Sequence, residues 1–332
     1  MVFQNIRWGI GTRVLVVLLI SCLAATVIVW GATRSLRRNA DQVKSDDAKT
    51  RSVEKLERLR QKYADVRSVH IAAKATIYLY GANARSGSGS YEYWADGERY
   101  RIKCSTDPHL ELFSDTEFAY DGQRFYFLDR KTGILSYRQQ DEPRSFAALP
   151  NPLFLPVDFL SRDDDDCVFC TPRLPEFKSK SARWSSRIEG IAIKSMGKDK
   201  TTANDITEVE MPGGIVEKIG FKLRMRVKES PDGSIRPTKI ERVGLDGKSL
   251  TSITFDNFMQ TAFGEFPLAI KMESFDESAS PMLTIEYAIR VLEVDQPIDN
   301  SIFAIRFEEA EGVWDSDARR FIKEKPPKAK PR

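Results

Sequence analysis

Hydrophobic and polar residues alternate along this chain at two periods, first that of an α-helix and then that of β-strands. Within residues 53–63, apolar side chains recur three or four positions apart, which predicts an amphipathic helix. Residues 69–79 instead alternate apolar and polar side chains at every second position, with small residues in the middle. This second period predicts a strand that packs one face against a core and turns the other toward solvent.

Further strands are predicted by the same alternation, and turn residues separate them about every ten residues. Asp-Gly pairs at 96–97, 121–122 and 246–247 are typical of hairpin turns. Strands do not alternate with helices, which disfavours a parallel sheet. The pattern therefore predicts an α+β protein that is mainly antiparallel β, with strands also over 91–94, 100–104, 118–120, 124–128, 134–137, 219–227, 235–243, 250–258, 266–275 and 282–294.

Residues 14–33 are predicted to span a membrane. Val14–Ala32 is an uncharged run of 19 residues, about the length that crosses a bilayer core. Basic residues flank the run, and Trp8 and Trp30 lie near its ends, where indole rings favour the interface. We interpret it as an uncleaved signal-anchor; a cleaved secretory signal and lipidation of Cys22 are the alternatives. Under each alternative the body is extracytoplasmic, so we expect a periplasmic body anchored by one N-terminal helix.

The net charge of +3 is the sum of unlike regions. Residues 1–44 carry +5 and residues 319–332 carry +6, which leaves −8 on the sequence between them. An acidic body does not favour nucleic-acid binding. Charge and pattern together divide the chain into a basic N-terminus (1–13), the membrane span (14–33), a linker (34–52), a folded domain (53–314) and a basic, Pro-rich tail predicted to be disordered (315–332).

Residues 143–177 interrupt the strand pattern with closely spaced prolines. An apolar patch over 149–160 predicts one or two short helices, and the acidic run 163–166 is interpreted as a solvated loop in preference to a calcium site. Cys167 and Cys170 follow as a candidate disulfide, since an exported compartment is oxidising. Pairing of either with Cys104, a zinc site completed by Cys104 and His109, and a redox motif are the alternatives.

Candidate catalytic chemistry is sparse. The chain has only 2 His and 4 Cys, and no nucleophile lies at motif spacing from a base. We therefore expect no enzyme, no metal and no cofactor. The strand over 218–228 places five cations on its polar face, which either contacts anionic headgroups or is a solvent face near acids such as Glu241 and Asp256.

The order of these elements resembles the periplasmic lipoprotein-carrier family, the LolA/LolB-like half-barrel. The residues that carry the resemblance are the opening helix at 56–63, the strand–Asp-Gly–strand segment 118–127, the mid-chain apolar insertion 149–160 and the closing segments 297–303 and 310–313. The resemblance covers residues 53–314. It implies a curved half-barrel sheet whose apolar concave face is closed by short helices.

A concave apolar face could hold acyl chains. The resemblance thus implies a binding protein for lipid, acyl chains or lipoproteins that acts in envelope lipoprotein handling. The alternative is an envelope sensor or scaffold module that binds a protein partner on the convex face. The residues expected to line the apolar site are Ile71, Ile77, Leu79, Tyr100, Ile102, Phe154, Phe159, Phe221, Leu223, Met225, Ile285 and Tyr287.

Overall fold

A computed structural model describes residues 49–61, 65–110, 115–139, 149–153, 155–156, 190–198, 205–216, 219–229, 235–261 and 264–323. The chain divides into two compact units, Met1–Ser52 and Val53–Arg332. Among the described residues, no helix is long and apolar enough to cross a membrane. Several predicted features lie outside them: the span 14–33, most of the linker 34–52, Phe154, Phe159, the acidic run 163–166, Cys167, Cys170 and the tail from 324.

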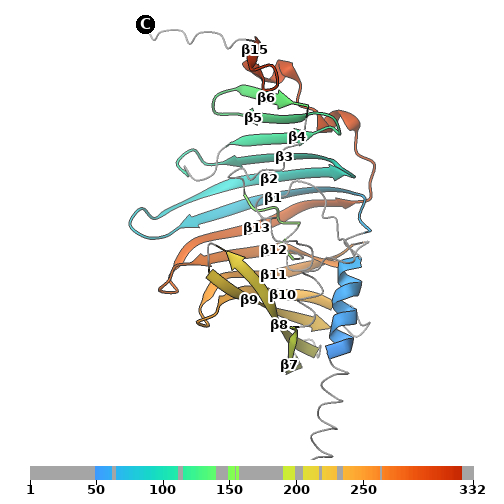
Figure 1. Cartoon of the computed structure of the whole chain (residues 1–332), viewed down its shortest axis with the longest axis vertical. Helices are drawn as coiled ribbons and strands as arrows, with labels where there is room; N and C mark the ends of the chain where they lie inside the picture. Colours follow the sequence, from blue (N-terminus) through green and yellow to red (C-terminus); the bar gives the residue numbers. More distant parts are fainter. Residues whose placement is uncertain are drawn as a thin grey trace, which may run out of the picture. The chain divides into compact units, whose positions relative to one another are not determined.

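The strands form one open sheet, as Figure 1 shows. Its order is β15-β14-β6-β5-β4-β3-β2-β1-β13-β12-β11-β10-β9-β8-β7. Neighbours pair antiparallel except β14 and β6, which are parallel. The bounds are β1 Ser68–Leu79, β2 Arg85–Asp96, β3 Arg99–Thr106, β4 Thr116–Tyr120, β5 Phe125–Asp129, β6 Ile134–Arg138, β7 Ala192–Lys198, β8 Asp205–Val216, β9 Ile219–Glu229, β10 Ile235–Gly244, β11 Ser249–Thr261, β12 Gly264–Phe275, β13 Pro281–Val294, β14 Gly312–Asp315 and β15 Arg320–Lys323.

The sheet is two meanders joined at β1 and β13. Consecutive hairpins build β1 to β6 and β7 to β13, and β1 then pairs with β13 from Val69 opposite Val294 to Leu79 opposite Leu283. All three Asp-Gly turns close hairpins as predicted, and Gly97, Gly122 and Gly247 have φ values of +60°, +98° and +85°. An L side chain rarely adopts such values, so glycine is the residue that these turns favour.

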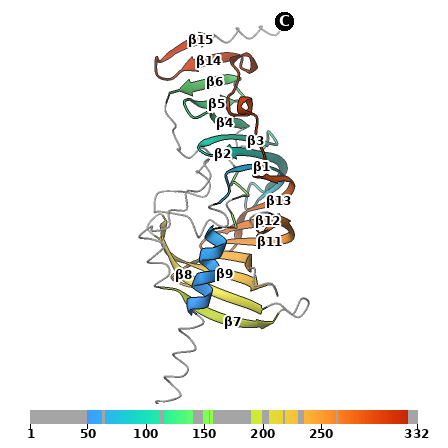
Figure 2. The same cartoon turned by 90° about the vertical axis from the view of Figure 1, so that its right-hand side faces the viewer.

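One apolar core covers what we call the inner face of the sheet. It contains buried side chains from β1 to β5 and from β8 to β13. The helix over 49–61 lies beside the β8–β11 part of the sheet in both views (Figures 1 and 2) and adds Leu56 and Leu59 to this core. The helix confirms the amphipathic pattern, with Leu56 only 1% exposed.

A smaller core lies on the opposite face, which we call the outer face, over β4 to β6. Ile305, Ala310 and Val313 pack there, next to the 3-10 helices η1 (Asn300–Phe303) and η2 (Phe307–Glu309). A buried cluster of charged side chains attaches this segment to the outer face of the sheet. Glu117 on β4 is fully buried and pairs with Arg101 on β3, whose Nη1 also donates to the carbonyl of Ile302 at 2.8 Å.

The structure differs from the sequence prediction in three places. β7 and β8 lie in a region for which no strand was predicted, because Pro212 and the following glycines interrupt the alternation of β8. β15 lies within the tail predicted to be disordered, and it is only four residues long and rich in charge. In the apolar patch, residues 152–153 and 155–156 form turns where a short helix was expected; proline at both 152 and 156 removes the backbone donors that a helix needs.

Candidate functional site

The predicted lining residues that the structure describes all lie on the inner face. β1, β3, β9 and β13 supply them, and side chains of this set pair directly across strands, as Ile77 does with Ile285. Leu79 packs against the core, and the others are buried within it: Ile71, Ile77, Tyr100, Ile102, Phe221, Leu223, Met225, Ile285 and Tyr287. Their role as a ligand lining stays a prediction.

Small residues leave a dent in the middle of this face. Ala75 on β1 lies opposite Gly89 on β2, and Ile77 lies opposite Gly87. A Cβ placed on Gly87 would be 2.7 Å from Leu110 Cδ1, and one on Gly89 would be 3.5 Å from Leu149 Cδ1. Leucine side chains from outside the sheet therefore fill the dent that the small residues leave.

Leu149 belongs to the segment 149–156, and we call the described residues of that segment (149–153 and 155–156) the cover segment. Leu149, Leu153 and Leu155 are each at most 3% exposed, yet the cover segment contains only turns. Apolar burial holds it more than backbone hydrogen bonding does.

Two side chains of the sheet make hydrogen bonds to the backbone of the cover segment: Cys104 on β3 bonds to Leu149, and Tyr287 on β13 bonds to Pro150. The hydroxyl of Tyr287 on β13 donates to the carbonyl of Pro150 at 2.7 Å in a buried position. Burial raises the pKa of Tyr287 well above its ordinary value, so the phenol stays a donor. Asn151 Oδ1 accepts from Leu153 N at 3.0 Å, but Asn151 Nδ2 is buried and has no hydrogen-bond partner among the described residues. An unpaired buried donor weakens the attachment.

Cys104 lies on the inner face beside this site and carries a free thiol, so its pairing with Cys167 or Cys170 is wrong. Burial raises its pKa to about 12, which keeps it protonated and unreactive. His109 Nε2 lies 2.8 Å from the carbonyl of Ser86. No group of three or more His, Cys, Asp or Glu side chains that could hold a metal ion gathers in the described ranges, and the zinc alternative also needs Cys167 and Cys170, which lie outside them.

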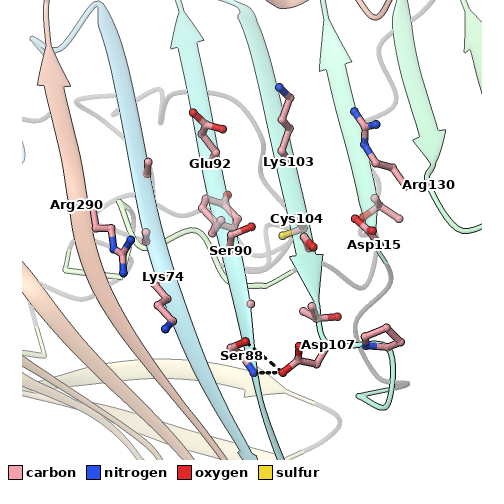
Figure 3. A pocket seen from close by; sticks show the side chains of 18 residues that line it. Lys74, Ser88, Ser90, Glu92, Lys103, Cys104, Asp107, Asp115, Arg130 and Arg290 are labelled. Atoms are coloured by element: carbon pink, nitrogen blue, oxygen red, sulfur yellow. Dashed lines mark hydrogen bonds between the residues drawn. The ribbon is translucent and has the colours of Figure 1, made fainter. Parts of the chain in front are cut away.

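A second candidate site lies on the outer face. It is a hollow of about 950 Å³ over β13, β1, β2, β3 and β4, and Figure 3 shows the side chains that line it. Lys74 and Arg290 reach it from one side, and Lys103 and Arg130 from the other. A smaller hollow of about 440 Å³ over β1, β13, β12 and β11 shares Lys74 with it. Sequence reasoning missed this site, although Ser88 and Ser90, at alternate positions of the sequence, are among the short side chains that line it.

His70 lies next to the larger hollow and bridges three strands. Its Nδ1 is 2.9 Å from Glu293 Oε2 on β13, and its Nε2 is 3.2 Å from Glu92 Oε1 on β2. Its ring also stacks on Trp94 at 5.0 Å between centroids. Hydrogen bonding to Glu92 raises the pKa of His70, against the lowering effect of burial. The imidazolium is thus stabilised across the seam between the two meanders.

The cationic strand at 218–228 has carboxylate partners on the outer face of β8. Lys222 Nζ is 2.8 Å from Glu210 Oε1, Arg224 Nη2 is 3.3 Å from Glu210 Oε2, and Arg226 Nη2 is 3.8 Å from Glu208 Oε2. The acids that pair with these cations are Glu208 and Glu210; the expected Glu241 lies directly opposite Arg224 on β10, and its carboxylate is 2.8 Å from Lys239 Nζ. This pairing supports the solvent-face interpretation of the strand.

Comparison with known proteins finds similarity in structure but not in sequence. No protein-family model matches the chain, and no curated protein matches its sequence. Among solved structures, a LolA superfamily protein from Nitrosomonas europaea is 12% identical at a TM-score of 0.39 and covers 76% of this chain and 98% of its own. A DUF1329 family protein from Desulfovibrio piger is 9% identical at a TM-score of 0.41 and covers 78% of this chain and 97% of its own.

A third structure, a protein domain from Vibrio parahaemolyticus named for outer membrane lipoprotein sorting, is 13% identical. Its TM-score is 0.40, and the match covers 75% of this chain and 96% of that one. The expected resemblance to LolA-like proteins is therefore confirmed. These values describe a likeness of architecture and carry no argument about a ligand.

Proposed function

We propose that the folded body binds the acyl chains of a lipid or lipoprotein on its inner face, in the dent that the cover segment fills. The observation that carries the proposal is the dent at Ala75 and Gly89, beside which Leu149 lies; Leu149 belongs to the cover segment, whose leucines are buried although its described residues form no helix or strand. Leucine side chains and acyl chains are both alkyl groups. An acyl chain can therefore replace the cover leucines with contacts of the same kind.

The free energies favour such an exchange. Exposing Leu149, Leu153 and Leu155 costs about 5–9 kcal/mol at about 1.5–3 kcal/mol for each buried leucine. Burying about fourteen methylene groups of a palmitoyl chain stabilises by about 11 kcal/mol at about 0.8 kcal/mol each. A full-length chain thus offsets the release of the cover segment, whereas a short chain of about six methylenes does not.

Photo-cross-linking tests the site. A palmitate analogue with a diazirine near its end is added to the full chain, and cross-linked peptides are identified by mass spectrometry. Ala75→Leu fills the dent from the inner face, whereas Thr76→Leu is a matched control because residue 76 points to the outer face. We expect cross-links at inner-face strands that Ala75→Leu removes and Thr76→Leu keeps. Equal labelling of these strands in the wild type, Ala75→Leu and Thr76→Leu proteins would refute the proposal.

The compartment belongs to the same proposal. The uncharged run 14–32 anchors the chain in an envelope membrane and leaves the body extracytoplasmic, where it takes part in lipoprotein handling. Alkaline phosphatase and a fluorescent protein, each fused after Arg38, report on which side of the membrane the body lies. We expect active phosphatase and a dark fluorescent protein; the opposite pair of results would place the body in the cytoplasm and remove the envelope role.

A further inference from the structure

One row of residues runs across the strands from the larger outer-face hollow into the smaller one. Ser105 on β3 lies opposite Ser90 on β2, and Ser90 lies opposite Lys74 on β1. The row continues from Lys74 to Ala288 on β13 and Ala269 on β12. Directly opposed residues have Cβ atoms about 5 Å apart, so Ser105, Ser90 and Lys74 present three adjacent donors to the hollow.

A β-bulge brings a fourth donor to the same place. The register of β1 and β13 shifts between Ala72 and Ala73, which lie opposite Val291 and Ile289. Arg290 is the extra residue between them, and its side chain lies beside Lys74 over the hollow (Figure 3). Bulges redirect side chains next to binding sites. Here the bulge adds a guanidinium to the row of donors.

These donors are unused within the described part of the chain. Lys74, Arg290, Ser90 and Ser105 make no side-chain hydrogen bond or ion pair there. Other outer-face cations differ: Lys271 Nζ, for example, is 2.9 Å from Glu273 Oε1. Asp107 interacts with Lys74 through its charge and makes no hydrogen bond or ion pair with it. Two cations without such a bond, beside two hydroxyl groups, form an arrangement that favours an oxyanion.

The acids around the hollow have other partners or lie at its far side. Glu92 binds His70, and Asp107 accepts from Ser88 Oγ at 3.2 Å as well as from Ser88 N. The hydrogen bond from Ser88 N lowers the pKa of Asp107. Asp115 lies beside Arg130 at the other side, and burial raises its pKa. Lys103 and Arg130 contact the buried Glu117, so Lys74 and Arg290 are the cations of the hollow that make no ion pair within the described residues.

We propose that this hollow binds a phosphate ester, with Lys74 and Arg290 neutralising the phosphate and Ser90 and Ser105 donating hydrogen bonds to it. A tetrahedral phosphate group offers acceptors in several directions, which suits four donors from three strands and a bulge better than a planar carboxylate does. The hollow of about 950 Å³ leaves room beyond the phosphate for a glycerol or sugar group. The ester is either a phospholipid headgroup or a soluble phosphorylated polyol.

Two measurements on the full chain in micelles of an uncharged detergent separate these sources. In the first, glycerol 3-phosphate is titrated and the heat of binding is recorded. In the second, micelles carry either phosphatidylglycerol or diacylglycerol of the same acyl composition, and retained lipid is counted by native mass spectrometry. Because the two lipids share their tails, acyl binding on the inner face contributes equally to both.

The test variant is Lys74→Gln with Arg290→Gln. Both side chains are exposed, so the unfolding midpoint should be unchanged. The matched control is Lys222→Gln, an outer-face cation that pairs with Glu210. Removing two charged contacts should weaken phosphate binding at least about ten-fold.

Glycerol 3-phosphate binding that weakens at least about ten-fold in the double variant, with the control unchanged, supports the site with a soluble ester as ligand. Suppose instead that glycerol 3-phosphate gives no heat of binding, but phosphatidylglycerol is retained in preference to diacylglycerol and the double variant loses this preference. That result supports the site with a lipid headgroup as the ligand. The proposal is overturned if glycerol 3-phosphate does not bind and phosphatidylglycerol is not preferred to diacylglycerol. It is also overturned if the double variant binds the phosphate probe as well as wild type does, or if Lys222→Gln weakens that binding equally.

Discussion

Tyr287→Phe should increase the affinity of the inner face for an acyl chain. The substitution removes one hydroxyl from a side chain that is 2% exposed and leaves the ring in place. That hydroxyl makes the 2.7 Å hydrogen bond to Pro150, through which β13 holds the cover segment. If an acyl chain displaces the cover segment, the wild-type protein must break this bond and the variant need not.

The size of the effect follows from the bond. A neutral intramolecular hydrogen bond contributes about 1 kcal/mol net, so the apparent dissociation constant should fall about five-fold. The same loss should lower the free energy of unfolding by about 1 kcal/mol. A matched control is Tyr126→Phe, which removes the 2.9 Å hydrogen bond to Asp121 far from the cover segment. It should lower stability to a similar degree and leave affinity unchanged.

A fluorescent fatty acid that brightens in an apolar site measures both variants, and urea denaturation gives their stabilities. The reasoning is refuted if Tyr287→Phe binds no more tightly than wild type while its stability has fallen. It is also refuted if both variants gain affinity equally, because general loosening would then explain the gain.

Three further predictions concern the scaffold. Glu117→Gln should lower the free energy of unfolding by about 3 kcal/mol, because it leaves Arg101 buried without its carboxylate partner. Glu210→Gln on the outer face should lower it by less than about 1 kcal/mol. Equal losses of stability in urea denaturation would contradict this prediction. The pKa of His70 is raised above 6.5 in the folded protein, so protonated His70 stabilises the fold. The difference in unfolding free energy between wild type and His70→Gln should be full below pH 6.5 and should decline as the pH rises through the folded pKa. A difference that is constant from about pH 5 to about pH 8 would argue against this prediction. Gly89→Ala should lower the melting temperature in calorimetry, since its Cβ would lie 2.8 Å from a backbone carbonyl oxygen of β3, and an unchanged value would show that the strands can separate freely.

The sequence by itself determined the helix, most strands and the hairpin turns. Residues 235–243 and 282–294 were predicted as strands and form β10 and β13 with nearly those bounds. Alternation and Asp-Gly turns are local signals, so a single sequence carries them. The same signals assigned Ile77 and Tyr287 to the apolar face, on which both lie.

The tertiary structure alone decided how distant strands align. The pairing of β1 with β13, the bulge at Arg290 and the parallel contact of β14 with β6 depend on residues far apart in the chain. A shift of one residue in register would place Lys74 beside other neighbours and remove the row of donors with Ser90 and Ser105. Periodicity fixes which face a side chain occupies, whereas register fixes which side chains meet, and both candidate sites depend on register.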